Sequence, residues 1–352
     1  MWFDVLEVRD PRWETLFRAL PLAQQDVFYA PGFARLCQET LNASDAVACA
    51  AYTNDAGALL LYPFVRRDVG ALLGAEFAEG LFDTLSLYGR GGVVGVAEPD
   101  ALEDFYVLLA RYLVNNRVFC SFDRFHPVIG NHAAVSRQAQ VRHVGGFVVV
   151  DLRPPLEDVL AACKQSVRKD MRKAERKGVT CFAEANCDHL GDFLEIYYQT
   201  MDRNAASDYY YFSEAFFTEL SRLAEGQFHF FYAVHENRVV SCELVLHHGL
   251  YAHSFLGGTR RDALPLAANP LLKSEILRQM REIGCAYFLL GGGQRPNDGI
   301  YNFKQAYAPD GVFASYVGGT VWQPTLYEGL LRDISAAGRE LSSGRFQFYD
   351  LS

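Results

Sequence analysis

The sequence predicts a mixed α/β (α+β) fold made of two similar domains, each with a central mixed sheet flanked by helices. Three observations predict it. The chain has 352 residues, of which 50% are hydrophobic, and this is enough to bury two cores of ordinary size. Segments with helical spacing alternate with strand-like runs along the whole chain. The two halves also resemble each other weakly, at an offset of about 180 residues.

The internal resemblance rests on two pairs of segments. Phe28 to Pro31 leads into an apolar helix in the first half, and Tyr210 to Ser213 does so in the second. A turn at 54–57 separates two strand-like runs, as a turn near 235–237 does in the second half. A duplicated domain explains both pairs, and chance similarity between two α/β halves is the alternative.

Hydrophobic periodicity and turn residues place the individual elements. The expected helices span residues 13–20, 31–41, 100–114, 156–177, 188–202, 213–224, 267–283 and 325–342. The expected strands span residues 47–53, 58–66, 117–122, 145–152, 179–184, 228–235, 239–247, 250–256 and 285–290.

Composition excludes several classes of protein. The net charge of −9 argues against a surface that binds nucleic acid throughout, but allows a local basic patch. The eight cysteines include no CxxC pair, so we expect reduced core residues and no metal site. The first residues carry Asp4, Glu7 and Asp10 and lack the apolar core of a signal peptide. No apolar run is long enough to span a membrane, and peripheral membrane contact is left open. The cysteines, as reduced core residues, lead us to expect a cytoplasmic protein.

A glycine-rich stretch stands out at residues 291–304. The apolar run Tyr287–Leu290 ends in three glycines, and Tyr301-Asn302-Phe303-Lys304 follows a polar loop. Glycines allow the backbone to approach a ligand closely, and a lysine beside them can stabilise developing negative charge. The spacing does not fit a dinucleotide-binding fingerprint, and we expect no helix after the glycines. An ordinary turn with an exposed lysine is the alternative.

A basic segment is the sharpest local departure from the acidic total. Residues 164–177 contain seven cations and two anions. Lys164, Arg168, Arg172 and Arg176 recur every four residues and therefore form one stripe on a helix, with Lys173 beside it. Such a stripe can follow a phosphate backbone. A solvated helix face is the alternative, because most charge runs are one.

Two polar residues in apolar strands are candidates for proton transfer. Glu243 lies within Val239–Leu246, and a carboxylate in such a strand is either paired or functional. His253 lies in the next strand, so the two residues are candidate neighbours across the ladder. A buried ion pair of Glu243, with Arg203 as a candidate partner, is the structural alternative.

Several segments together resemble the Fem-type (FemABX-like) aminoacyltransferases over about residues 25–320, most specifically in the second half. The segments that carry the resemblance are Thr200–Asn204, Tyr209–Ser213, Glu243–Leu246, His253–Thr259, Ala268–Lys273 and Gly291–Lys304. The resemblance implies two tandem GNAT-like domains with a cleft between them. The first would comprise residues 1–145 and a returning C-terminal helix within 321–352, and the second residues 146–320. It also implies the compact form, without a helical arm.

The resemblance implies transfer of an amino acid from aminoacyl-tRNA to an amine acceptor, with aminoacyl-tRNA as co-substrate and no cofactor. Lys304 would support acyl transfer and Phe303 would lie by the tRNA acceptor end, with Asn302 between the two aromatic residues 301 and 303. The acceptor would be contacted by Arg203, Tyr209, Phe255 and Tyr88. The basic stripe (Lys164, Arg168, Arg172, Lys173, Arg176) would bind the tRNA, and Glu243 and His253 would be the candidates for proton transfer.

The sequence leaves alternatives for the identity of the acceptor and for that of the acyl donor. Phe255 replaces an expected tyrosine and Asn204-Ala205 an expected Asn-Gly, so the acceptor is a peptidoglycan precursor or another small-molecule or natural-product amine. An acyl-CoA-dependent GNAT N-acyltransferase is the first alternative, although residues 259–265 lack the glycines of a pyrophosphate-binding turn. A non-catalytic RNA- or peptide-binding module is the second.

Overall fold

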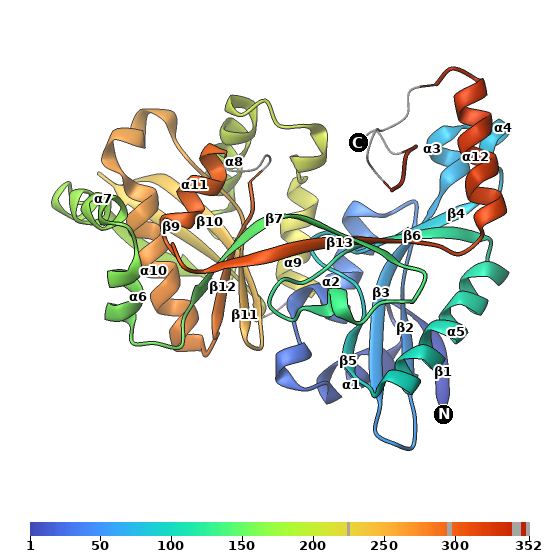
Figure 1. Cartoon of the computed structure of the whole chain (residues 1–352). Coiled ribbons are helices and arrows are strands. Elements are labelled where there is room, and N and C mark those ends of the chain that lie inside the picture. The colour runs from blue at the N-terminus through green and yellow to red at the C-terminus, as the bar shows by residue number, and fades with distance from the viewer. Residues whose placement is uncertain (224–225, 294–297, 340–345, 350–352) are drawn as a thin grey trace. The chain divides into compact units, whose positions relative to one another are not determined.

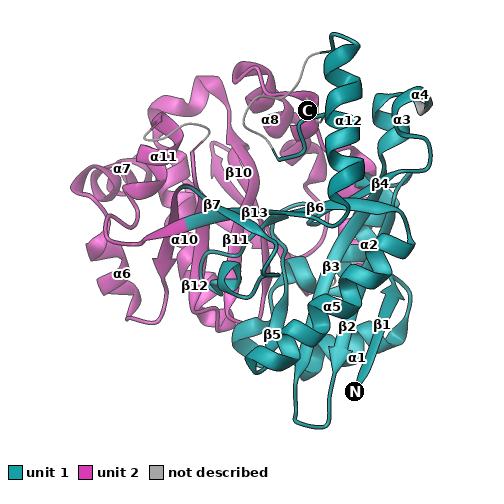
Figure 2. Ribbon diagram, turned by 45° about the vertical axis from the view of Figure 1, so that its right-hand side comes forward, with its two compact units in different colours: residues 1–144, 315–352 teal, residues 145–314 magenta. Residues whose placement is uncertain are grey.

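The chain folds into two compact units (Figure 2), as seen in a computed structural model that describes residues 1–223, 226–293, 298–339 and 346–349. Unit 1 comprises residues 1–144 and 315–352, and unit 2 comprises residues 145–314. Unit 1 therefore takes in the chain from Ser315 onward, whereas the sequence assigned residues up to 320 to the second domain.

The sheet of unit 1 runs in the order β1-β2-β3-β4-β6-β13 (Figure 1). Its strands are β1 (Trp2–Glu7), β2 (Ala46–Thr53), β3 (Leu59–Asp68), β4 (Phe82–Leu85), β6 (Val118–Arg124) and β13 (Val312–Val321), and β5 (Val94–Val96) pairs with β3 beside this path. The sequence missed β1, β4, β5 and β13. Two of these, β4 and β5, are only four and three residues long, too short for an alternating pattern to be recognised.

The helices of unit 1 include one from the C-terminal part of the chain. They are α1 (Pro11–Ala19), α2 (Pro31–Leu36), α3 (Val69–Leu73), α4 (Ala75–Ala78), α5 (Pro99–Asn115) and α12 (Pro324–Ala336). Leu330 and Ile334 of α12 pack into one buried cluster with Val69 and Phe119. The C-terminal helix is thus part of the core of unit 1, as the resemblance implied.

The sheet of unit 2 runs in the order β7-β12-β11-β10-β9-β8. Its strands are β7 (Gln140–Asp151), β8 (Thr180–Glu184), β9 (Phe228–His235), β10 (Arg238–His248), β11 (Tyr251–Thr259) and β12 (Tyr287–Gly291). Its helices are α6 (Leu156–Ala162), α7 (Gln165–Arg176), α8 (Leu190–Arg203), α9 (Glu214–Leu223), α10 (Ala268–Ile283) and α11 (Gly299–Gln305).

The two units repeat one topology. β1-β2-β3-β4-β6 and β8-β9-β10-β11-β12 both consist of antiparallel neighbours followed by one parallel pair, β4 with β6 and β11 with β12. A parallel pair needs a crossover, which α5 and α10 supply. The last strand in each unit is antiparallel: β13 on β6, and β7 on β12. The duplication inferred from the sequence is therefore present in the fold.

The matching hairpins show why the internal resemblance was visible in the sequence. In unit 1 the turn between β2 and β3 is held by Asn54, whose Oδ1 accepts hydrogen bonds from the backbone N–H groups of Ala56 and Ala58. Gly57 in that turn has φ +89°, a conformation that favours glycine. In unit 2 the turn at Glu236 and Asn237, both with positive φ, joins β9 to β10.

Candidate active site

The glycine stretch at the end of β12 brings Lys304 against the backbone. Gly291 has φ +98°, and a Cβ atom at this position would lie 2.8 Å from Lys304 Nζ. The Lys304 ammonium donates a hydrogen bond of 2.9 Å to the carbonyl oxygen of Gly292. Gly291 is therefore needed for its conformation and also because a side chain would displace the lysine. Residues 294–297, part of the predicted stretch, lie outside the described residues.

A short helix follows the glycines, which corrects the expectation that none does. α11 begins after Asp298, whose Oδ1 accepts a 2.7 Å hydrogen bond from the backbone N–H of Tyr301. Ile300 and Phe303 are 43% and 45% exposed, and Asn302 is exposed as well. The helix thus presents an aromatic ring and an amide to solvent, while it turns Lys304, which is half-buried, toward the glycines.

The expected helix over 156–177 is interrupted, and the interruption connects the basic segment to α11. Cys163 and Lys164 are extended, which ends α6 at Ala162 and starts α7 at Gln165. The backbone N–H of Lys164 donates a 2.8 Å hydrogen bond to the carbonyl oxygen of Ala306, and Cys163 Sγ lies 3.3 Å from that of Tyr307. These tertiary bonds replace helical ones, so periodicity alone could not reveal the break.

α7 has one apolar face and one cationic face. Val167, Met171 and Ala174 are buried in the core of unit 2. Lys164, Arg168, Arg172 and Arg176 are exposed, and Lys173 is half-buried. Within the described ranges, no carboxylate forms an ion pair with any of the four exposed cations. Neighbouring like charges on a helix repel each other. A bound polyanion would remove this repulsion and so stabilise the helix.

Glu243 forms a buried ion pair with Lys273 of α10. The lysine ammonium donates to both carboxylate oxygens, at 2.5 Å to Oε1, and the Ser254 hydroxyl donates to Oε1 at 2.6 Å. The side chains of Glu243 and Lys273 are 5% and 4% exposed. Arg203, the partner that the sequence suggested, instead donates to the carbonyl oxygen of Thr259 at 3.0 Å.

The expectation that Glu243 and His253 are ladder neighbours is wrong. In the β10–β11 ladder Glu243 pairs with Gly257, and His253 pairs with Leu246. The turn after His248 sets this register, and a bulge that makes Phe255 an extra residue on β11 shifts it. His253 is buried in β11 and also pairs with Leu289 of β12.

The residues expected to contact the acceptor have unequal environments. Tyr209 is 46% exposed, beside the ring of Tyr210. Phe255 packs on the rings of Phe212 and Phe216, with centroids 5.8 and 6.2 Å away. Arg203 is held at the end of α8 by its bond to Thr259. Tyr88 belongs to unit 1, where it follows β4.

Lys273, which the sequence did not single out, completes the polar cluster in unit 2. It lies on the apolar face of α10, beside Ile276 and Leu277. A lysine among buried apolar positions of an amphipathic helix was the available signal, because such a residue requires a buried anion.

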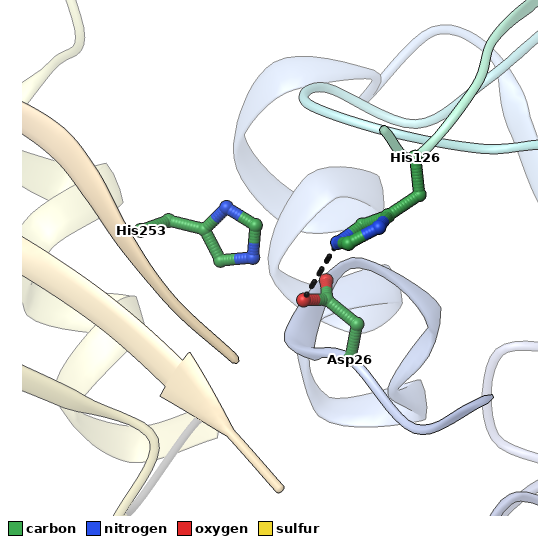
Figure 3. A group of neighbouring side chains, drawn as sticks. All are labelled: Asp26, His126 and His253. Atoms are coloured by element: carbon green, nitrogen blue, oxygen red, sulfur yellow. Dashed lines mark ion pairs between the residues drawn. The ribbon is translucent and has the colours of Figure 1, made fainter. Parts of the chain in front are cut away.

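Unit 1 contains an acid–imidazole pair that the sequence did not suggest. His126 Nε2 lies 3.5 Å from Asp26 Oδ2, and both side chains are wholly buried (Figure 3). His126 Nδ1 accepts a hydrogen bond of 3.0 Å from the backbone N–H of Ile129. Because Nδ1 is an acceptor, the proton of the neutral ring is on Nε2, which faces the carboxylate. The two residues are 100 positions apart in the sequence, so no local pattern pointed to them.

Comparisons with known proteins agree on the fold. Residues 161–305 match a family described as "Acetyltransferase (GNAT) domain", a range that begins just before α7 and ends with α11. No curated protein sequence matches the chain. No helix in the described ranges has both the length and the apolar character needed to cross a membrane.

Three solved structures resemble the chain at low sequence identity. FemX matches with a TM-score of 0.70 at 11% identity, over 92% of this chain and 99% of its own. L-PGS from Bacillus licheniformis matches with a TM-score of 0.55 at 12% identity, over 95% and 98%. A tandem GNAT protein from the clavulanic acid biosynthesis pathway matches with a TM-score of 0.51 at 10% identity, over 91% and 99%. The chain therefore has a tandem GNAT fold.

Proposed function

We propose that this protein transfers an aminoacyl group from aminoacyl-tRNA to the amine of a small-molecule acceptor and so forms an amide bond. The observation that carries the proposal is the link between the basic helix and the lysine helix. The backbone N–H of Lys164 donates a hydrogen bond to the carbonyl oxygen of Ala306, which is two residues after Lys304 in the sequence. The first cation of α7 is therefore joined to the chain directly after Lys304. The likeness of the fold to FemX supports the proposal.

The cationic face of α7 would hold the tRNA. Its exposed cations lack carboxylate partners among the described residues, so counterions released from a phosphate backbone would favour binding. Lys173 would contribute from the edge of that face. The exposed ring of Phe303 offers a stacking surface for a terminal base.

Lys304 would stabilise the negative charge that develops on the ester carbonyl. The attacking amine forms the new C–N bond, the C–O bond to the ribose breaks, and the ribose oxygen leaves with a proton. An ester is already activated, so positioning and charge stabilisation are the main contributions required of the protein. The hydrogen bond to Gly292 O fixes the position of the ammonium at the end of β12.

The amine proton would pass to one of two side chains, Glu243 or His253. Glu243 already accepts hydrogen bonds from Lys273 and Ser254, and these favour a structural carboxylate. His253 carries an imidazole, the group most often used for proton transfer near neutral pH. Both are therefore retained as candidates, and substitution separates them.

The amine acceptor would be a peptidoglycan precursor or a natural-product amine. Arg203, Tyr209, Phe255, Asn302 and Tyr88 are the proposed contacts with it. Exposed Tyr209 and Asn302 offer hydrogen-bonding groups, and Phe255 offers an apolar one. Aminoacyl-tRNA would be the co-substrate, without a further cofactor.

An acyl-CoA-dependent N-acyltransferase is the alternative, favoured by the match of residues 161–305 to the GNAT acetyltransferase family. In unit 2 the chain enters α10 through a short helix, Arg261–Leu266, that contains no glycine. A pyrophosphate-binding turn normally needs glycines so that its N–H groups can approach the phosphates. Titration with acetyl-CoA tests the alternative: saturable binding that competes with the transfer reaction would favour it.

The deciding experiment measures transfer of radiolabelled amino acids from a full set of charged tRNAs to a panel of amines. The expected result is enzyme-dependent loss of label from one or a few tRNAs, with an amide product, in the wild type but not in Lys304→Met. Gln305→Ala, one residue away on α11, is the control and should retain activity. No enzyme-dependent deacylation with any tRNA and acceptor would refute the proposal. Binding of tRNA without turnover would indicate a non-catalytic module.

A further inference from the structure

Unit 1 contains a cavity of about 380 Å³ beside α5. Its wall is mostly apolar and includes Leu102, Val107 and Ala110 of α5 together with Trp322. Val107 is 53% exposed and contributes apolar surface to the open side of this cavity. At the rim Glu103 accepts a 2.5 Å hydrogen bond from Arg137, so these two charges neutralise each other.

A second, much smaller cavity adjoins the first. Four residues line both cavities: Tyr106, Val135, Ser136 and Trp322. The smaller one has a volume of about 10 Å³, which is room for a single water-sized group. The rings of Tyr62 and Phe125 join those of Tyr106 and Trp322 in its wall, so four aromatic side chains surround it.

A carboxylate completes the wall of the small cavity. Asp123 accepts hydrogen bonds from the Tyr62 hydroxyl at 3.0 Å and the Ser86 hydroxyl at 3.1 Å, and another from the Gly92 N–H. All three donors are neutral. In the described part of the chain, no lysine, arginine or histidine forms an ion pair with Asp123. Burial accordingly raises the pKa of this carboxyl to about 6, because its charge lacks a compensating cation.

The aromatic wall is held in place before any ligand arrives. The Tyr106 hydroxyl donates to the carbonyl oxygen of Ala134 at 2.8 Å. Trp322 Nε1 donates to the Ser121 hydroxyl at 2.6 Å. Both rings are thereby fixed at the boundary between the two cavities, and preorganised groups lose little entropy when they bind.

We propose that unit 1 binds a primary ammonium carried on an apolar body, with the ammonium in the small cavity against Asp123 and the body in the larger cavity beside α5. Aromatic rings around a carboxylate are the surroundings that recognise an organic cation. The small volume selects –NH3⁺ over a trimethylammonium group, and the carboxylate excludes anions. This proposal is independent of the transfer reaction assigned to unit 2.

Isothermal titration calorimetry of the full chain tests the site with four probes. 2-Phenylethylamine and hexylamine should bind saturably at pH 7.5. Their neutral counterparts, 2-phenylethanol and 1-hexanol, should bind at least about tenfold more weakly, because a close charge pair contributes at least that much. The trimethylated derivative of 2-phenylethylamine should also bind poorly, since its head exceeds the small cavity.

Matched variants locate the binding. Asp123→Asn should weaken amine binding at least about tenfold and abolish the preference over the alcohol. Asp100→Asn removes another carboxylate that lines the larger cavity and should change the affinity less than about twofold, as expected for an exposed charge. Ala110→Phe should fill the larger cavity and reduce binding without touching Asp123. Melting temperatures identify any variant that fails to fold.

The pH dependence gives a further check. The other titratable groups that face Asp123 are the hydroxyls of Tyr29, Tyr62 and Tyr106, whose pKa values burial raises above the usual value for tyrosine. Asp123 is therefore the one among these that titrates between pH 5 and 7, and amine binding should fall as the pH drops through about 6. Equal binding of amine and alcohol, unchanged affinity in Asp123→Asn, or no binding at millimolar probe would each overturn the proposal.

Discussion

Unit 1 and unit 2 share a strand order but treat buried charge differently. In unit 2 the buried carboxylate of Glu243 is neutralised by Lys273, whereas the exposed cations of α7 have no carboxylate partner among the described residues. In unit 1 Asp83 is paired with Arg67, while the described hydrogen-bond donors to Asp123 are all neutral. One topology thus carries the proposed anion-binding face in one unit and the proposed ammonium site in the other. The difference lies in which charges are left without a partner, and the fold alone does not fix that.

The largest effect should follow from breaking the Glu243–Lys273 pair. Lys273→Met leaves the carboxylate buried without its cation, so the free energy of unfolding should fall by about 3–5 kcal/mol in urea denaturation. The double variant Glu243→Gln, Lys273→Met should recover most of that stability. If the double variant is stable but has lost transfer activity, Glu243 takes part in the reaction. Retained activity would leave His253 as the candidate base.

Substitution of Lys304 should affect the reaction rather than the fold. Lys304→Met should lower kcat about 10²- to 10³-fold, as for loss of one oxyanion donor, because the ammonium is proposed to act on the transition state. Lys304→Arg should retain part of the rate. Single-turnover assays with charged tRNA, quenched at set times, measure the chemical step directly. Unchanged rates in Lys304→Met would show that unit 2 does not use this cation.

Asp123 should make the stability of unit 1 depend on pH with a defined sign. The pKa of Asp123 is raised from 3.8 to about 6. Between these two pH values the folded state therefore retains a proton that the unfolded state has released. Its contribution is therefore favourable at low pH and is lost as the pH rises through about 6. Relative to wild type, Asp123→Asn should gain at most about 3 kcal/mol between pH 4 and pH 7, at 1.36 kcal/mol per pKa unit. A pH-independent difference in urea denaturation would contradict this assignment.

The smallest effect should come from a single cation of the basic face. Arg172→Gln should weaken tRNA binding a few-fold and reduce the slope of log affinity against log salt by roughly 0.7–0.9, the value for one phosphate contact. Arg278→Gln on α10, an arginine already paired with Glu275 and Glu282, is the control. Filter binding over a range of salt concentrations measures both. An unchanged slope would mean that α7 is only a solvated face.

Local patterns were sufficient for most helices and strands of unit 2. The periodicity of residues 228–256 predicted β9, β10 and β11 to within a few residues, because these strands are long and rich in buried apolar and aromatic residues. The same reasoning failed at Cys163 and Lys164, where the helix is broken by hydrogen bonds to residues 306 and 307. It also missed α11, whose start depends on the cap provided by Asp298.

The candidate site was predicted in its parts and not in its arrangement. The glycines, Lys304 and the spacing of the cations on α7 were visible as residue types at fixed intervals. The partner of Glu243 was not, since Lys273 is 30 residues away and reaches it through the packing of α10 on the sheet. Asp123 gave no signal at all, because its surroundings come from β3, α5, the segment 135–139 before β7, and β13 with Trp322 after it.

By itself the sequence determined a duplicated α/β chain with a cationic helix and a lysine after a glycine turn, because hydrophobic period and backbone freedom are local properties. The tertiary structure alone decided which charges are neutralised and which remain unpaired. That outcome depends on side chains brought together from distant segments, because the interaction between two charges changes strongly over a few ångströms. Glu243 lies close enough to Lys273 to form an ion pair, whereas the described hydrogen-bond donors to Asp123 are neutral.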